Sequence, residues 1–151
     1  MYFHPYLAFT LAFRYRIPVI ILTDGFIAHL TEDVTPPEIL PNLDDVSWAL
    51  RADKETRNIL CSIHLKPEEM REFKQRMKDK YRVIAWREAR CEKFMTEDAD
   101  LAFVAFGMAA RAAKKAVKLL RKRGIRAGLL RPITLNPMPV KDVRELSKRV
   151  K

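Results

Sequence analysis

One stretch, residues 101–139, constrains the fold more than any other part of the chain. Residues 101–106 form an unbroken apolar run, which is typical of a strand buried on both faces of a parallel sheet. Residues 108–123 then carry small apolar side chains at helical spacing, with basic side chains on the opposite face. After Gly124, residues 127–130 form a second short apolar run. The stretch therefore predicts a strand, a helix and a strand, joined by default as a right-handed parallel crossover.

An ordered loop and a closing helix are expected after the second strand. Arg131 and Thr134 follow this strand, at the edge of the sheet where open α/β proteins bind ligands. A guanidinium there suits a carboxylate, a phosphate or a neighbouring subunit, and a plain surface arginine fits the pattern equally well. The prolines at 132, 137 and 139 restrict the backbone and favour a loop of defined shape. Residues 140–150 then have the apolar spacing of an amphipathic helix.

The N-terminal part predicts a helix that leads directly into a strand. Pro5 suits the first turn of a helix, and apolar side chains recur along one stripe as far as Tyr15. Residues 18–22 are apolar and mostly β-branched, which predicts a buried strand with no strand near it in sequence to pair with. Asp24 follows this strand at a usual ligand position, although an aspartate that simply turns the chain is the more economical interpretation.

The middle of the chain predicts a connector and a long charged helix. Residues 35–56 contain three prolines and an acidic pair, which indicates the best candidate domain boundary. Pro67 and the two glutamates after it predict a helix that we expect to extend to about Lys93.

Gly107 lies between the predicted strand at residues 101–106 and the helix that follows it, so it permits an anion to approach the first amides of that helix. Plain strand-to-helix packing is the simpler explanation of this glycine.

Charged residues are unevenly distributed along the chain, and this limits the kinds of partner that the chain is expected to bind. Residues 1–50 hold two Arg against six Asp or Glu, whereas the remainder holds 27 basic against 13 acidic residues, for a net charge of +10. This asymmetry suits an anionic ligand, an acidic partner subunit or nucleic acid. The basic helix has no interleaved aromatic residues and no reading motif, which argues against nucleic acid. No apolar run approaches the roughly 18 residues of a membrane span, so we expect a cytoplasmic protein without a membrane partner.

The sequence offers contacts but no catalytic machinery. It contains no glycine-rich nucleotide loop, no zinc-protease motif and no nucleophile elbow. Cys61 and Cys91 lack the spacing of a zinc site or a disulfide framework, so we expect two reduced thiols. We therefore assign no catalytic, cofactor-binding or metal-binding residue. The candidate interface or ligand-side contacts are Asp24, Gly107, Arg131 and Thr134.

Four segments resemble one known family, in the family's own order. Residues 94–111 (FMTEDADLAFVAFGMAAR) and 128–139 (GLLRPITLNPMP) are similar to the α subunit of the 2-oxoacid:ferredoxin oxidoreductases, most of all to its branched-chain, 2-oxoisovalerate type. Residues 6–30 (YLAFTLAFRYRIPVIILTDGFIAHL) and 58–70 (NILCSIHLKPEEM) resemble the same subunit. The resemblance covers nearly the whole of this chain and only the C-terminal part of that subunit.

The resemblance implies an α/β fold and a place in a complex. It makes residues 1–40 the last helix and strand of a pyrimidine-binding domain and 41–66 a linker. Residues 67–151 then form an incomplete domain similar to the transketolase C-terminal domain, a parallel sheet with flanking helices. The family oxidatively decarboxylates 2-oxo acids to acyl-coenzyme A with thiamine diphosphate, and passes electrons through iron–sulfur clusters to ferredoxin. Since the family residues that bind these cofactors are not found here, we expect this chain to be inactive alone and to assemble with β, γ and δ subunits.

Three positions depart from the family pattern and keep a second hypothesis open. Asn136 and Met138 stand where the family would have aromatic residues, and His29 stands where it would have glutamine. The alternative is a stand-alone interaction or regulatory module, derived from that subunit but without catalysis. Its basic helix at 108–123 would bind an acidic partner or a second copy of the chain as a homodimer.

Overall fold

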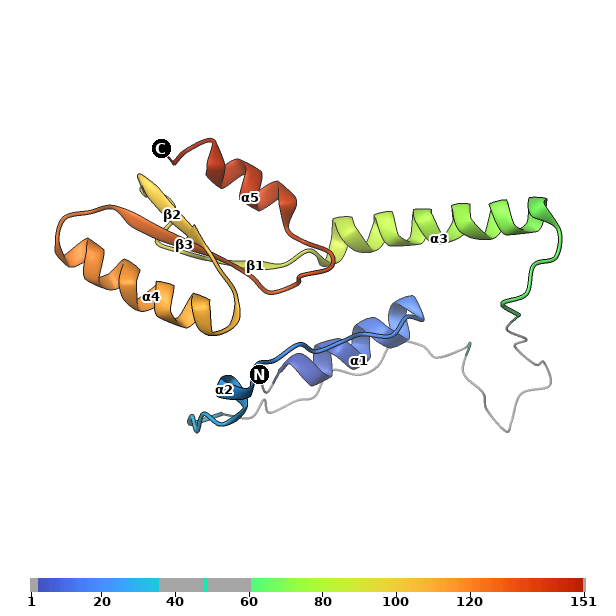
Figure 1. Cartoon of the computed structure of the whole chain (residues 1–151), viewed down its shortest axis with the longest axis horizontal. Coiled ribbons are helices and arrows are strands. Elements are labelled where there is room, and N and C mark those ends of the chain that lie inside the picture. Colours follow the sequence, from blue (N-terminus) through green and yellow to red (C-terminus); the bar gives the residue numbers. More distant parts are fainter. Residues whose placement is uncertain (1–2, 36–47, 49–60, 151) are drawn as a thin grey trace. The chain divides into compact units, whose positions relative to one another are not determined.

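The computed structural model describes residues 3–35, 48 and 61–150, which fall into two compact units. The first unit comprises residues 1–22 and 32–81, and the second comprises residues 23–31 and 82–151. The elements are α1 (His4–Tyr15), α2 (Gly25–Ala28), α3 (Pro67–Glu88), β1 (Cys91–Phe94), β2 (Leu101–Val104), α4 (Gly107–Lys122), β3 (Ala127–Pro132) and α5 (Val140–Ser147) (Figure 1). The α/β class expected from the sequence is confirmed. Most of the predicted connector lies outside the described residues.

In the first unit, the C-terminal end of α1 is fixed by several contacts. Arg16 adopts a left-handed conformation with a φ of 51°, and the amide of Ile17 donates to the carbonyl of Ala12 at 3.2 Å. The carbonyl of Arg16 accepts a hydrogen bond from Lys80 Nζ at 3.4 Å, and its guanidinium carbon lies 5.2 Å from the centroid of the Trp48 ring. The helix nevertheless buries none of its residues. Its apolar stripe is therefore only partly covered.

The predicted strand at residues 18–22 does not form in this structure. These residues have no regular secondary structure, and Ile20 and Leu22 are 85% and 72% exposed. A strand requires a neighbouring strand for its backbone hydrogen bonds and apolar cover for its side chains. None of the strands in the described part of the chain pairs with this segment.

The second unit contains a three-stranded sheet in the order β1-β3-β2. Strands β2 and β3 are parallel, in register from Leu101 opposite Ala127 to Val104 opposite Leu130, which confirms the parallel pairing of the predicted crossover. The sheet predicted as parallel is mixed, because β1, which was not predicted, runs antiparallel to β3. The prediction that the long helix extends to about Lys93 is also wrong. The helix ends at Glu88, and the residues that follow pair with β3.

Helices α4 and α5 cover opposite faces of this sheet (Figure 1). The face toward α4 holds a buried cluster of Val117, Ala127 and Leu129, whose exposures are 2% or less. The partly buried residues packed against this cluster are Phe94, Leu101, Phe103, Ala105, Ala113 and Leu120. Successive side chains of a strand point to opposite faces, so the fully buried Leu130 faces the α5 side. Helix α5 contributes Leu146, which is 3% exposed. Strand β3 therefore lies between two apolar layers.

Gly128 in β3 is required by a close backbone approach. A Cβ at this position would lie 2.7 Å from the carbonyl oxygen of Met95, 3.0 Å from the Cα of Thr96 and 3.1 Å from the Cβ of Ala99. The segment that contributes these atoms precedes β2, and Thr96 and Ala99 are both buried. The absence of a side chain at Gly128 allows this segment to pack directly on the central strand.

We expect Gly128→Ala to destabilise the second unit by about 1–3 kcal/mol, the usual cost of overpacking a close-packed site. The main obstacle to the added methyl group is backbone, which cannot rotate away as a side chain can. Gly25→Ala is the matched control, since a Cβ at Gly25 would meet nothing within 4 Å. Urea unfolding followed by circular dichroism measures both variants. Equal stability of Gly128→Ala and the unmodified protein would contradict the close approach.

Candidate functional site

The structure brings Asp24 and Gly107 together, although they were predicted from distant parts of the sequence. Asp24 caps the short helix α2, and its Oδ1 accepts a hydrogen bond from the amide of Ile27 at 2.7 Å. Its other oxygen, Oδ2, lies 3.3 Å from the position that a Cβ of Gly107 would take. Gly107 begins α4 with a φ of 59°, a conformation that favours glycine.

This arrangement places a carboxylate at the start of α4. Negative charge is favourable at a helix N-terminus, where the first amides lack intrahelical acceptors. Asp24 is exposed and supplies that charge from within the chain. A free anion approaching the same amides would meet the carboxylate, so the geometry favours a structural contact between α2 and α4 over an anion site.

Arg131 lies within β3 and not in the loop after it, because the strand extends to Pro132. Its partner is Glu92, which stands opposite it on β1. The Nη2 and Nε atoms of Arg131 lie 2.7 Å and 2.9 Å from Glu92 Oε2, while Lys114 Nζ of α4 lies 2.8 Å from Oε1. We call these three side chains the Glu92 triad. It joins two strands and the helix that covers them.

The electrostatics of the triad favour the ionised form of Glu92. The hydrogen bond from Lys114 lowers the pKa of Glu92 below its ordinary value of 4.5, partial burial opposes this shift, and Arg131 adds to the lowering. Lys114 Nζ also lies 4.9 Å from the centroid of the Phe94 ring. The triad holds one carboxylate between two cations, an arrangement that suits a fixed contact between the three elements.

Thr134 fixes the loop after β3 to the residue that precedes β1. Its Oγ1 accepts a hydrogen bond from the amide of Arg90 at 2.8 Å, and its own amide donates to the carbonyl of Arg90 at 3.2 Å. The amide of Ile133 donates to the same carbonyl at 2.9 Å. Thr134 therefore binds the backbone of Arg90, just before β1, and Arg131 binds the side chain of Glu92 within β1.

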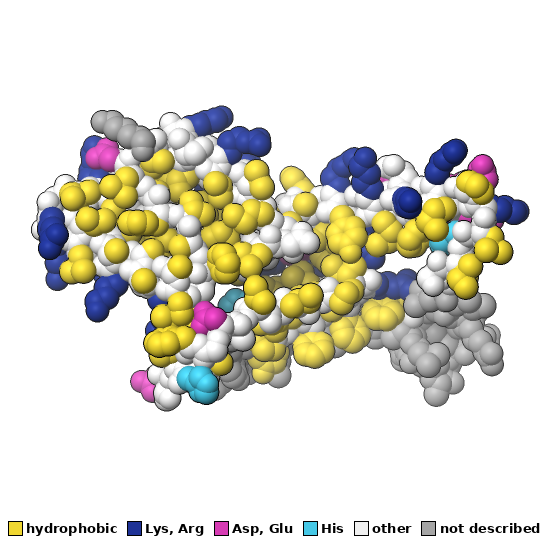
Figure 2. Space-filling model, in the orientation of Figure 1, with side chains coloured by type: hydrophobic (Ala, Val, Ile, Leu, Met, Phe, Trp, Pro, Cys, Tyr) yellow, Lys and Arg dark blue, Asp and Glu magenta, His cyan; other side chains and the backbone are white. Residues whose placement is uncertain are grey.

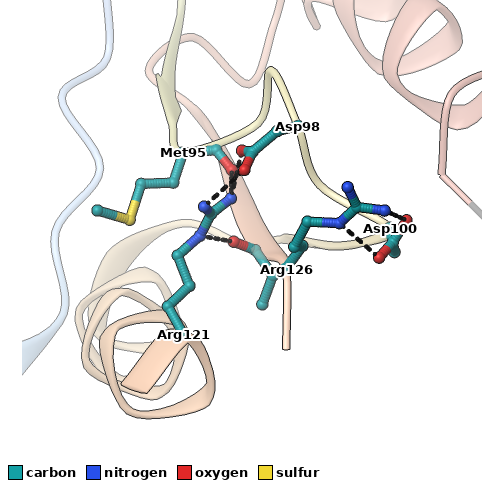
Figure 3. Close-up of polar contacts among 6 residues, drawn as sticks. Met95, Asp98, Asp100, Arg121 and Arg126 are labelled. Atoms are coloured by element: carbon teal, nitrogen blue, oxygen red, sulfur yellow. Dashed lines mark hydrogen bonds and ion pairs between the residues drawn. The ribbon is translucent and has the colours of Figure 1, made fainter. Parts of the chain in front are cut away.

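Two arginines that the sequence analysis did not single out organise the other end of the sheet (Figure 3). Arg121 binds both carboxylate oxygens of Asp98, at 3.0 Å and 2.7 Å, and donates to the carbonyls of Met95 and Ala127 at 2.8 Å and 2.7 Å. Arg126 binds both oxygens of Asp100, at 2.9 Å and 2.8 Å. The acidic residues on either side of Ala99, just before an apolar strand, were the available signal for these contacts.

The thiol of Cys91 is not arranged for reactivity. Burial raises the pKa of the Cys91 thiol, and the nearby Asp142 raises it further. Asp142 itself pairs with Lys93 at 2.6 Å, which lowers the pKa of the aspartate. The protonated thiol is therefore favoured. Cys91 and Cys61 are both free cysteines and lie in different units.

The described residues do not fit an iron–sulfur cluster, one of the cofactors that the family resemblance implies. In the part of the chain that the structure describes, no three His, Cys, Asp or Glu side chains come together as a metal site. An iron–sulfur cluster needs four cysteine ligands, whereas the sequence has two cysteines.

No helix among the described residues has both the length and the apolarity needed to cross a bilayer. The candidate site is thus a set of internal contacts that shape the edges of the sheet.

The pH dependence of the stability lost in Glu92→Gln tests whether the charge of Glu92 stabilises the triad. A carboxylate with a lowered pKa stabilises the fold above its unfolded pKa, and this stabilisation is lost as the pH falls through the lower folded pKa. At about pH 7 we expect the substitution to cost roughly 1 kcal/mol or less, as for other partly exposed pairs. At about pH 3, below the ordinary value of 4.5, the cost should be smaller than at pH 7.

Urea unfolding at the two pH values measures this difference. The control is Glu145→Gln, since Glu145 is 52% exposed and lies 4.0 Å from Lys141 within α5. This variant should change little at either pH. A Glu92→Gln cost that does not depend on pH would show that the charge of Glu92 is not what stabilises the contact.

Comparison with known proteins connects these residues to one group of enzymes. Residues 99–151 match the family described as pyruvate:ferredoxin oxidoreductase core domain II. The chain is 43% identical over 143 residues to the ketoisovalerate oxidoreductase subunit VorB of Methanothermobacter marburgensis, covering 93% of this chain and 41% of that protein. It is 32% identical over 164 residues to the 2-oxoglutarate synthase subunit KorA of Archaeoglobus fulgidus, covering 99% of this chain and 44% of that protein.

A third relative matches a shorter region. The pyruvate synthase subunit PorA of Pyrococcus furiosus is 34% identical over 80 residues, covering 53% of this chain and 18% of that protein. The chain thus spans about two fifths of the length of the VorB and KorA relatives. The matched core domain includes β2, α4, β3 and α5 and excludes β1. The chain is therefore similar, over most of its length, to part of the subunits of 2-oxoacid oxidoreductases.

Proposed function

We propose that the chain works as part of the α subunit of a cytoplasmic 2-oxoacid:ferredoxin oxidoreductase of the ketoisovalerate type. The observation that carries this proposal is the 43% identity to the ketoisovalerate oxidoreductase subunit over 93% of this chain. The 2-oxoglutarate synthase subunit reaches 32% over a comparable region, and the pyruvate synthase subunit matches only about half of the chain. This difference favours a branched-chain 2-oxo acid as the substrate of the complex.

In this proposal the chain supplies scaffold and subunit interface, and the reacting groups lie on other domains or subunits. The complex would convert the 2-oxo acid to acyl-coenzyme A with thiamine diphosphate and pass electrons through iron–sulfur clusters to ferredoxin. Other domains of the subunit, or the β, γ and δ subunits, would hold these groups. We retain the proposed division into residues 1–40, 41–66 and 67–151, as domain tail, linker and transketolase C-terminal-like domain.

An apolar surface supports an interface at the carboxyl edge of the parallel strands. Val104 and Phe106, at the end of β2, are 49% and 52% exposed. In and after the loop that follows β3, Leu135, Met138 and Val140 are 39%, 39% and 51% exposed. Because β2 and β3 are parallel, these groups follow the same edge of the sheet. Exposed apolar side chains gathered at one edge are typical of surfaces that bind other proteins.

Co-expression tests the proposal directly. We expect a tagged form of this chain to retain the remaining subunits of a ketoisovalerate oxidoreductase, supplied together with the part of its α subunit that this chain does not match. The purified assembly should reduce ferredoxin when given 2-oxoisovalerate and coenzyme A, and the chain alone should not. If no subunit is retained, the proposed function is wrong.

Arg131→Ala separates a role in assembly from a role in stability. Lys114 keeps Glu92 paired when Arg131 is removed, so we expect a stability loss within about 1 kcal/mol. We expect a larger effect on retention of the other subunits, because Arg131 is 40% exposed near the apolar carboxyl edge. Arg126→Ala is the matched control, since it breaks the exposed pair with Asp100 at the opposite end of β3. A lowered melting temperature with an unchanged complex would contradict the assembly role.

The second candidate function is a stand-alone interaction module, and the charge of α4 is the observation that favours it. The helix contains no acidic residue, and Lys115, Lys118 and Lys122 on it are exposed. Such a surface suits an acidic partner protein. A stable homodimer that ignores every oxidoreductase subunit would favour this alternative. Salt-sensitive retention on DNA would instead indicate nucleic-acid binding.

A further inference from the structure

We propose that a pocket in the second unit binds a free α-amino acid with a short aliphatic side chain. The pocket has a volume of about 580 Å³, which is large enough for a small metabolite. Its lining comes from β1, the loop between β1 and β2, the end of α4 and the residues after α5. It therefore lies at the end of the sheet opposite the apolar carboxyl edge. The inference goes beyond the proposed function and does not rest on it.

The loop that forms one wall of the pocket is held in a fixed conformation. Met95 has a φ of 52°, which is uncommon for a residue other than glycine. Arg121 donates to the carbonyl of Met95 at 2.8 Å and binds both carboxylate oxygens of Asp98 (Figure 3). The close approach at Gly128 packs the same loop against β3. Uncommon backbone conformations that the surroundings hold in place are typical of ligand-binding segments.

Most of the charged side chains in the lining already have partners. Asp98 is bound by Arg121, with the two closest atoms 2.7 Å apart. Lys93 Nζ lies 2.6 Å from Asp142 Oδ1. These two cations are each offset by a carboxylate, so neither offers an uncompensated charge to a ligand.

Two lining residues of opposite charge lack such partners. Glu97 and Arg149 form no ion pair with each other or with any other residue that the structure describes. Thr96 also lines the pocket and is 3% exposed, and its hydroxyl makes no hydrogen bond within the described part of the chain. Buried polar groups are normally hydrogen-bonded. A carboxylate, a guanidinium and a hydroxyl are thus available to one ligand.

A simple anion or cation matches this set poorly. On the face that Figure 2 shows, Lys and Arg side chains lie around the margin of the second unit and acidic side chains are few. A phosphate would therefore find basic groups at many points of this surface, whereas in the pocket it would also meet the carboxylate of Glu97. A simple cation would meet the guanidinium of Arg149. The pocket differs from the surrounding surface in offering one unpaired charge of each sign.

An α-amino acid satisfies both charges at once. Its carboxylate suits bidentate binding by Arg149, and its ammonium group suits Glu97. The hydroxyl of Thr96 can donate to the ligand carboxylate or accept from its ammonium group. Met95, which is 45% exposed, offers a flexible apolar surface to an aliphatic side chain. These contacts select a short aliphatic amino acid within the class of zwitterions.

Isothermal titration calorimetry of the full chain with L-valine tests the proposal. We expect a dissociation constant of about 1 mM or tighter. Isovalerate is valine without the amino group, and isobutylamine is valine without the carboxylate. Each should bind at least roughly tenfold more weakly than valine, because it leaves one ion of the pocket without a partner.

Substitutions in the lining identify the site. Arg149→Gln and Glu97→Gln should each weaken valine binding roughly tenfold or more. In Glu97→Gln, valine and isovalerate should bind about equally, because the carboxylate that selects the ammonium group is gone. Lys148→Gln and Glu145→Gln are the matched controls, since both residues are exposed and lie outside the lining. The melting temperature of the two pocket variants should not change, because neither side chain has a partner in the free chain.

Several results would overturn the proposal. No binding of valine at about 10 mM would do so. Isovalerate or inorganic phosphate binding to the unmodified chain as tightly as valine would show an anion site instead, and equally tight isobutylamine would show a cation site. Valine binding that both pocket variants leave unchanged would place the ligand elsewhere. None of these results bears on retention of the oxidoreductase subunits, which tests the proposed function separately.

Discussion

The second unit depends on the burial of β3 on both faces and its pairing on both edges. Among the strands described here, β3 alone has two neighbours, and its residues Ala127, Leu129 and Leu130 are almost completely buried. Helix α4 packs on one face through Val117, and the close approach at Gly128 admits the segment before β2. The other elements of the unit take their positions from this strand, so its apolar contacts supply the main driving force for the fold.

Ionic contacts at the edges of the sheet add little to the free energy of folding, but they fix how the strands and helices align. The Glu92 triad fixes β1 against β3 and α4, while Arg121 holds Asp98 and two backbone carbonyls at the opposite end. These side chains are partly exposed, and such pairs contribute modestly because water and salt screen them. Their geometry is nonetheless specific, since a bidentate arginine accepts few alternative registers. The apolar core drives folding, and the charged margin determines how the elements align.

The sequence predicted what local periodicity determines and missed what pairing between distant residues determines. The crossover of β2, α4 and β3 was found because its apolar runs and its amphipathic helix have distinct periods. Strand β1 was missed because Glu92 and Lys93 look like a continuation of the charged helix, and its pairing with β3 decides its structure. The salt bridge of Arg131 was missed for the same reason, since its partner lies on β1. The proximity of Asp24 to Gly107 also needed the structure.

Residues 18–22 and β1 both show that a segment forms a strand only where a neighbouring strand is available to pair with it. Strand β1 has weak β character and forms because β3 offers it an edge, whereas residues 18–22 have strong β character and no regular secondary structure. Strand formation is thus a property of the available neighbours more than of the segment. In the second unit the described strands have these neighbours within the chain. In the first unit, none of the described strands pairs with residues 18–22, and Ile20 and Leu22 stay exposed.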